Sequence, residues 1–95
     1  MAFSVYILFS HKLKRFYVGT TDDVNKRFSE HNSGRYPDAF SSRGIPWVLF
    51  LVINNLNSNQ AYNIERHIKA MKSSKYILNL KKYPDLLGKL IEKYQ

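Results

Sequence analysis

Five side chains of this 95-residue chain carry groups that are common in catalysis: two phenols, a guanidinium, an imidazole and a carboxylate. The phenols, Tyr6 and Tyr17, lie in successive apolar runs, within the triplets Ser4-Val5-Tyr6 and Tyr17-Val18-Gly19. Taken singly, each tyrosine is most often a core or interface aromatic. They become informative only if the chain brings them together with the other three groups.

The guanidinium and the imidazole belong to a predicted helix that follows the second triplet. At about 100° per residue, an arc of roughly 100° holds both apolar residues of this helix together with Arg27 and His31. Because Arg27 and His31 are one turn apart, both side chains can reach one ligand. The alternative is a snorkelling arginine and a histidine at the edge of the core.

The carboxylate, Glu65, borders the apolar stripe of a later predicted helix, between Ala61 and Ile68. The simplest interpretation of this position is a partly exposed residue that pairs with Lys69 at i+4. One glutamate is a poor magnesium site unaided, but Mg²⁺ keeps several waters and binds one carboxylate together with substrate phosphates. The five side chains could therefore form a metal-assisted phosphodiesterase site.

The charge of the chain is compatible with such a substrate. Fifteen basic and seven acidic residues give a formal net charge of +8, which raises affinity for polyanions by releasing their counterions. The alternative is a charge that serves only solubility. The apolar fraction of 44% excludes a disordered tail, and the absence of cysteine excludes disulfides and a cysteine-based zinc site.

We expect residues 1–95 to form a single domain, because this length supports one thin core. The N-terminus has no signal-peptide pattern, and the longest apolar run, Trp47 to Ile53, is too short to span a bilayer. We therefore expect a soluble cytoplasmic protein without a membrane partner. The oligomeric state is left open.

The hydrophobic pattern predicts strands at Phe3 to Phe9, Phe16 to Thr20 and Trp47 to Ile53, the last of them buried. Helices are predicted from the start signal Thr20-Thr21-Asp22-Asp23 to about Asn32, from Asn57 or Ser58 to about Lys72, from Ser73 or Ser74 to about Leu80, and from Pro84 onward. Their buried positions are predicted at Ala61, Ile64, Ile68 and Met71, and at Leu86, Leu87, Leu90, Ile91 and Tyr94. A basic, turn-rich loop precedes the third strand. The order predicts an α+β fold, with a small, largely antiparallel three-stranded sheet flanked by helices.

The first two strands are predicted to form a hairpin. If Phe9 pairs with Lys14 across a four-residue loop, Tyr6 lies directly opposite Tyr17, with Cβ atoms roughly 5 Å apart. The register is an assumption, since a slip by one residue would place the tyrosines on opposite faces.

In this order and spacing, the residues resemble the GIY-YIG nuclease domain, especially its small single-domain members akin to the N-terminal domain of an excision-repair subunit. The resemblance rests on the two triplets, on Arg27-x-x-x-His31 and on Glu65, and it is close over Tyr17 to Gly34 and Gly44 to Val52. It covers nearly the whole chain. Each triplet alone is weak, but the ordered set is specific.

The resemblance implies a nuclease that cleaves phosphodiester bonds in DNA with one divalent ion, Mg²⁺ or Mn²⁺. By position, Tyr6 would be the general base or its close partner, and Tyr17 would position the attacking water or the phosphate. Arg27 would hold the scissile phosphate, His31 would assist proton movement or bind the phosphate, and Glu65 would be the metal ligand. Because a free tyrosine has a pKa of about 10, nearby cations would have to favour the phenolate, a task for Arg27, His31 and metal-bound water.

Three positions qualify the resemblance. Ser4 stands where glycine gives the motif its name, and Thr20 stands where several members carry a lysine. If that lysine activates the tyrosine, His31 must take its role or activity is reduced. Asn79 loosely matches a late asparagine of some members.

The partner implied is DNA, either branched or non-specific duplex, with a protein partner as one source of target choice. The basic side chains that we expect to contact phosphates are Lys12, Lys14, Arg15, Arg35 and Arg43. Phosphate contacts do not specify sequence, so weak, salt-sensitive binding is expected. Two alternatives stay open: a non-catalytic nucleic-acid-binding module on the same fold, and a small adaptor. Glu65 separates the nuclease from the binding module, because binding alone needs no metal ligand.

Overall fold

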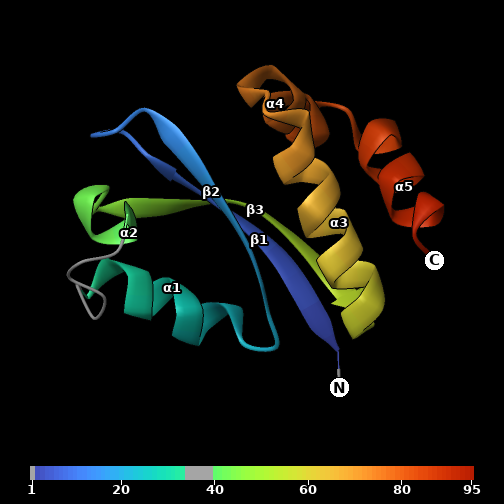
Figure 1. Ribbon diagram of the computed structural model, residues 1–95, viewed down its shortest axis with the longest axis horizontal. Helices are drawn as coiled ribbons and strands as arrows, with labels where there is room; N and C mark the ends of the chain where they lie inside the picture. Colours follow the sequence, from blue (N-terminus) through green and yellow to red (C-terminus); the bar gives the residue numbers. More distant parts are fainter. Residues whose placement is uncertain (1, 34–39) are drawn as a thin grey trace.

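A computed structural model of the chain describes residues 2–33 and 40–95. In these residues, three strands form one antiparallel sheet with helices on both faces (Figure 1). The elements are β1 (Phe3–Ser10), β2 (Arg15–Thr21), α1 (Val24–Asn32), α2 (Phe40–Arg43), β3 (Trp47–Leu56), α3 (Ser58–Met71), α4 (Ser74–Lys82) and α5 (Pro84–Lys93). This arrangement confirms the predicted α+β fold. No helix of the described segments is long and apolar enough to cross a membrane.

The central strand is β1, because the strand order is β2-β1-β3. Both of its faces are covered, so its middle residues are apolar without alternation, and none from Val5 to Leu8 is more than 1% exposed. Val5 and Ile7 pack with α3, α4 and α5, whereas Tyr6 and Leu8 pack with Trp47 and α1. The sheet therefore divides the core in two, and Tyr6 belongs to the α1 side.

The predicted hairpin register is wrong by two residues. Tyr6 pairs with Gly19 and not with Tyr17, because the loop begins after Ser10. The Ser10 hydroxyl accepts a hydrogen bond from the backbone N–H of Leu13 (3.0 Å) and so closes the turn. A shift by two residues preserves the face of every side chain, and the two tyrosines therefore still share one face.

Local capping signals place most helix boundaries where the sequence predicts them. Asn57 accepts a hydrogen bond from Gln60 N (2.8 Å) at the start of α3, and Ser73 accepts one from Tyr76 N (3.1 Å) at the start of α4. Pro84 occupies the first turn of α5, as expected. These side chains satisfy N–H groups that the first helical turn leaves free.

Of the predicted start signal Thr20-Thr21-Asp22-Asp23, it is the last residue that caps α1. The N-cap is Asp23, whose carboxylate accepts a hydrogen bond from Lys26 N (3.1 Å). The Thr21 hydroxyl accepts one from Asp23 N (3.0 Å), one position before the helix. The Thr20 hydroxyl is directed elsewhere, to Glu65.

Three further expectations are wrong in detail. Met71 is 46% exposed and not buried, because it ends α3. Val48 and Leu49 are also exposed (41% and 45%), since β3 is an edge strand whose pairing with β1 is irregular at this point. Part of the predicted loop before β3 forms α2.

Candidate active site

Tyr6 reaches from the central strand across β2, and the residue that it crosses is Gly19. A Cβ atom added at Gly19 would overlap Tyr6 Oη and lie 2.5 Å from Cζ. The whole phenol end of a buried ring would have to move. A glycine at this position of the second triplet therefore lets the Tyr6 hydroxyl approach the free edge of the sheet.

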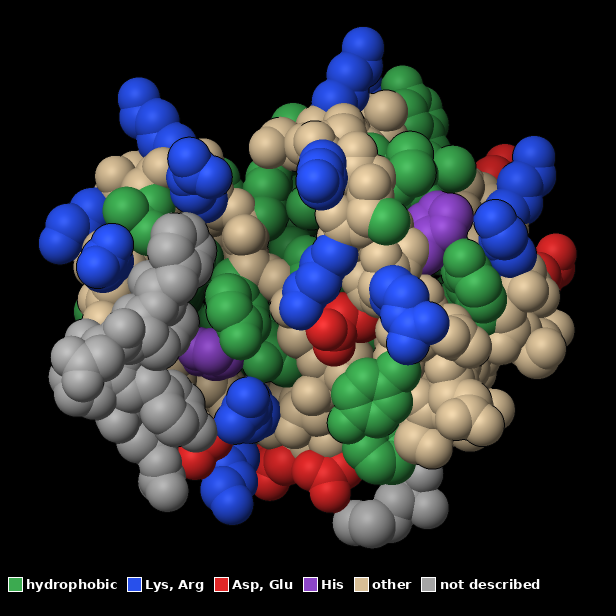
Figure 2. All heavy atoms as spheres, in the orientation of Figure 1, with side chains coloured by type: hydrophobic (Ala, Val, Ile, Leu, Met, Phe, Trp, Pro, Cys, Tyr) green, Lys and Arg blue, Asp and Glu red, His purple; other side chains and the backbone are tan. Residues whose placement is uncertain are grey.

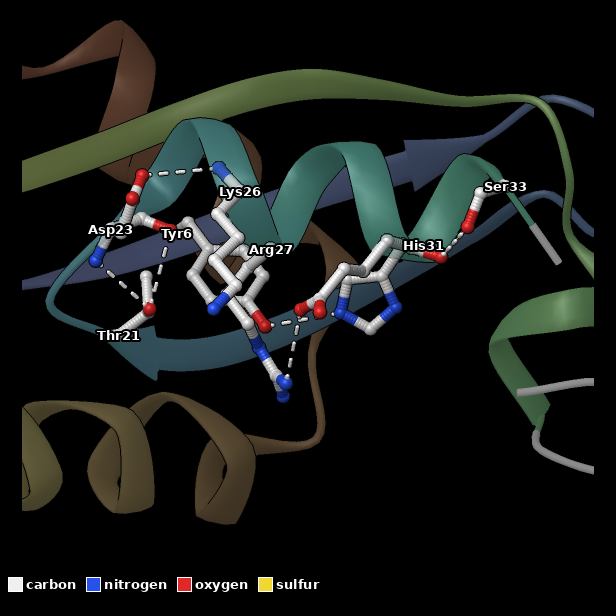
Figure 3. Close-up of polar contacts among 8 residues, drawn as sticks. Tyr6, Thr21, Asp23, Lys26, Arg27, His31 and Ser33 are labelled. Atoms are coloured by element: carbon white, nitrogen blue, oxygen red, sulfur yellow. Dashed lines mark hydrogen bonds and ion pairs between the residues drawn. The ribbon is translucent and has the colours of Figure 1, made fainter. Parts of the chain in front are cut away.

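Three aromatic rings meet on this face of the sheet. The rings of Tyr6 and Tyr17 stack with centroids 6.3 Å apart, and the His31 ring lies 4.6 Å from that of Tyr17. His31 Nε2 lies 3.1 Å from Tyr6 Oη, within hydrogen-bond distance (Figure 3). His31 is 3% exposed, so α1 inserts it beside the tyrosines and does not leave it on a solvated face.

The pKa values of this group are shifted by burial. Burial raises the pKa of Tyr6, although a hydrogen bond from Arg27 and its positive charge oppose the rise. Burial lowers the pKa of His31, and the charge of Arg27 lowers it further. At neutral pH the pair is therefore a phenol and a neutral imidazole. With the imidazole proton on Nδ1, Nε2 accepts a hydrogen bond from the Tyr6 hydroxyl.

Arg27 lies one turn before His31 and at the rim of the site. Its side chain is 37% exposed and forms an ion pair with Glu30 (3.6 Å). It also hydrogen-bonds with Tyr6, and Figure 3 shows its guanidinium beside the Tyr6 hydroxyl. Arg27 thus connects the buried phenol with solvent, where an anion could reach it.

Glu65 approaches from the opposite face of the sheet. Thr20 follows Gly19 in β2, so its side chain points to the α3 side, where its hydroxyl donates to Glu65 Oε1 (2.6 Å). Lys69 Nζ lies 2.8 Å from Glu65 Oε2, which confirms the predicted i+4 pair. Because β2 is an edge strand, the candidate site wraps around its free edge, with the tyrosines on one face and the carboxylate on the other. The charge of Glu65 contributes to the raised pKa of Tyr6, so the two groups interact across this edge.

Glu65 is the carboxylate that the sequence predicts as the metal ligand. The described part of the chain has no cluster of three or more acidic, histidine or cysteine side chains that could bind a metal. The donor set nevertheless fits Mg²⁺, which accepts one carboxylate when water and phosphate complete its shell. Lys69 occupies one carboxylate oxygen, and its side chain is 54% exposed, so it has room to move aside.

The remaining predicted residues that the structure describes lie around this centre and not within it. Lys12, Lys14 and Arg15 lie in or beside the β1–β2 turn, and Arg43 ends α2; all four are exposed. Arg35 lies outside the described residues. Asn79 lies in α4, where its described hydrogen bond is a backbone contact with Tyr83 (2.8 Å). Nothing described joins Asn79 to the tyrosine pair.

The sequence analysis did not predict the hydrogen bond between Thr20 and Glu65. The signal was available, because strand alternation places the neighbour of Gly19 on the face covered by α3. Strand alternation does not show which turn of α3 faces Thr20.

Comparison with known proteins identifies the family. The model of the GIY-YIG catalytic domain matches residues 2–77, which include the tyrosine pair, Arg27, His31 and Glu65 but not Asn79. The chain belongs to the GIY-YIG family. It is a nuclease family, and the resemblance seen in the sequence is thereby confirmed. A GIY-YIG relative from Vibrio campbellii, a "UPF0213 protein", is 33% identical over 72 residues, which are 76% of this chain and 67% of the relative. No solved structure matches the chain.

Proposed function

We propose that this GIY-YIG protein is a divalent-metal-dependent DNA endonuclease with little sequence preference. The observation that carries the proposal is the meeting of Tyr6, Tyr17, His31 and Arg27 at the edge of β2 that Glu65 approaches from the other face. A base, an anion-binding guanidinium and a metal ligand are the groups that phosphodiester hydrolysis needs. The site also lies at the surface of a chain with a net charge of +8.

The proposed proton path starts at the attacking water. As its oxygen bonds to phosphorus, the water gives a proton to Tyr6 Oη, and Tyr6 passes its own proton to His31 Nε2, 3.1 Å away. The P–O bond to the leaving oxygen breaks, that oxygen takes up a proton from solvent, and His31 returns the proton it gained to solvent. Since the lowered pKa keeps His31 neutral at neutral pH, it is ready to accept the proton. This path needs no preformed phenolate.

Arg27 and a metal ion held by Glu65 would stabilise the negative charge of the phosphate during the reaction. The guanidinium would bind the non-bridging oxygens of the phosphate, for which its fork of donors is suited. A divalent ion held by Glu65 would supply further positive charge against the charge that develops on the phosphate. Thr20 would hold the carboxylate in place through its 2.6 Å hydrogen bond, and Tyr17 would orient the water or the phosphate.

One observation favours the alternative, a nucleic-acid-binding module without catalysis. Lys69 pairs with Glu65 and so neutralises the one carboxylate that would hold a metal ion. If that pair persisted, the protein would bind DNA but would not cleave it. The two functions differ in one measurable property, cleavage that depends on a divalent ion.

The test of the proposal is Tyr6→Phe, which removes a single oxygen atom. Loss of general-base catalysis typically costs 10²–10⁴-fold in rate, so we expect turnover to fall by at least about a hundredfold while the Kd for DNA changes little. Tyr62→Phe is the matched control, because Tyr62 is 52% exposed on α3. Equal turnover of the two variants would reject the role given to Tyr6.

A further inference from the structure

A groove lies beside the candidate site, between β2 and the junction of α3 with α4. Its volume is about 460 Å³, and its lining residues include Tyr17 of the site and Lys69, the partner of Glu65. The space-filling view shows Lys and Arg side chains around the hollow on this face of the molecule (Figure 2). The groove is therefore continuous with the place where a scissile phosphate would lie.

The walls of the groove are basic. Arg15 comes from β2, while Lys69 and Lys72 come from the last turn and the cap of α3. The described lining residues include no aspartate or glutamate. Three cations along one channel make a path for a polyanion, since each can neutralise one phosphate. Lys69 would first have to release Glu65, with which it pairs (2.8 Å).

Lys72 holds an unusual backbone conformation for a lysine. It caps α3 with φ 47° and ψ 42°, in the left-handed region where glycine is the usual residue. A side chain at this position costs stability that a glycine would not, by roughly 1–2 kcal/mol. Glycine would avoid this cost, although a lysine at the end of a helix also interacts favourably with the negative end of the helix dipole. Lys14, in the β1–β2 turn, holds the same backbone conformation (φ 55°).

We propose that this groove binds the DNA backbone next to the scissile phosphate, with Arg15, Lys69 and Lys72 as its phosphate contacts. The inference rests on the proposed function, because it extends the same substrate away from the cleaved bond. The sequence predicted Arg15 as one of several surface cations that contact DNA. In the structure, Arg15 lines the same groove as Lys69 and Lys72 of α3. The occupant is the phosphodiester backbone and not a particular base sequence.

The test measures the salt dependence of binding to a labelled DNA duplex, in EDTA so that no cleavage occurs. The groove variant is Arg15→Gln with Lys72→Gln, and the matched control is Lys89→Gln with Lys93→Gln, which removes two exposed cations of α5 outside the groove. The slope of log K against log salt is negative, and each lost phosphate contact reduces its magnitude by about 0.9. We expect the magnitude of this slope to decrease by about 2 for the groove variant and by less than half of that for the control.

A second variant separates function from folding. Lys72→Gly relieves the left-handed lysine, so we expect an unchanged or higher Tm together with a loss of DNA affinity of roughly fivefold, the weight of one phosphate contact near physiological salt. A purely structural Lys72 would give the higher Tm without the loss of affinity, and that result would overturn the proposal.

The remaining outcomes distinguish this inference from the proposed function. Equal slopes for the groove and control variants would overturn the groove even if the protein cleaves DNA. A groove-dependent slope in a protein that never cleaves DNA would support the groove and reject the nuclease. Failure of the parent protein to bind the duplex would overturn the groove.

Discussion

At the scale of single residues, the position of the Tyr6 hydroxyl depends on the absence of a side chain at Gly19. The Tyr6 ring occupies the space where any other residue would place its Cβ atom. We expect Gly19→Ala to displace the Tyr6 hydroxyl and to lower the free energy of unfolding by about 1–3 kcal/mol, the usual cost of overpacking.

The control for this change is Gly88→Ala. An added Cβ at Gly88 meets nothing within 4 Å, and Gly88 lies inside α5, so the substitution should stabilise the protein by about 0.5–1 kcal/mol. Urea unfolding and cleavage assays on both variants check the prediction. Full activity of Gly19→Ala would contradict the placement of Tyr6 in the site.

Thr20 is a positioning residue in this account, because it acts through Glu65. Thr20→Val keeps the shape of the side chain but removes the hydrogen bond, and bonds to charged groups are worth about 1.5–3 kcal/mol. We expect turnover to fall by roughly ten- to a hundredfold and half-saturation with Mn²⁺ to shift to a higher concentration. Thr20→Ser retains the hydroxyl and should restore both values. A Thr20→Val variant with unchanged metal dependence would show that Glu65 needs no such support.

The buried imidazole of His31 should make the free energy of unfolding depend on pH. Its pKa in the folded protein is lowered from the ordinary value of 6.5, so below that pH the unfolded chain binds more protons than the folded one. The free energy of unfolding should therefore decrease as the pH falls below 6.5, until the pH passes the folded pKa. Unfolding of the parent and of His31→Gln across this range measures the contribution.

His67 must be considered in that measurement, since burial lowers its pKa as well. The difference in the free energy of unfolding between the parent and His31→Gln gives the contribution of His31. The difference between the parent and His67→Gln gives the contribution of His67. Cleavage should persist at pH 6.5 and decline only below the folded pKa of His31, where the imidazole no longer accepts a proton. A parent and a His31→Gln variant with identical stability profiles would contradict the buried neutral state.

At the scale of elements, the buried hydroxyl of Ser10 links the hairpin to the segment before β3. Ser10 Oγ accepts from Leu13 N (3.0 Å) and donates to the carbonyl of Gly44 (2.7 Å). Ser10→Ala leaves both groups without this partner, which should lower the free energy of unfolding by about 1–3 kcal/mol. Ser4→Ala, in the same strand, removes an exposed hydrogen bond to Asn54 and should cost much less. Similar losses in the two variants, measured by urea unfolding, would refute the link.

The same contact explains which parts of the fold could be predicted from the sequence. Helix starts at Asn57, Ser73 and Pro84 depend on neighbouring residues, and their signals are local. The hairpin register depends on Ser10, whose role is set by Gly44, a residue distant in sequence. A pattern of apolar residues does not reveal such a partner, so the shared face of Tyr6 and Tyr17 was predicted correctly while the hairpin register was not.

At the scale of the whole molecule, the candidate site combines two faces of the sheet. The order of the tyrosines, Arg27, His31 and Glu65 was sufficient to predict the family, and the structure brings the first four together. The position of Glu65 across the free edge of β2 was not predictable, because it depends on the strand order β2-β1-β3. Had β2 been the central strand, the same residues would be separated by the sheet.

The most direct test of the proposed nuclease activity is cleavage of supercoiled plasmid and a panel of branched DNAs with Mg²⁺ or Mn²⁺. It compares the parent with Glu65→Ala and with Glu92→Ala, an exposed glutamate of α5 that serves as the control. We predict cleavage that requires the divalent ion, is lost in Glu65→Ala and is retained in Glu92→Ala, with DNA binding preserved in all three proteins. Equal cleavage by Glu65→Ala and the parent, or binding without cleavage by the parent on every substrate, would contradict the account.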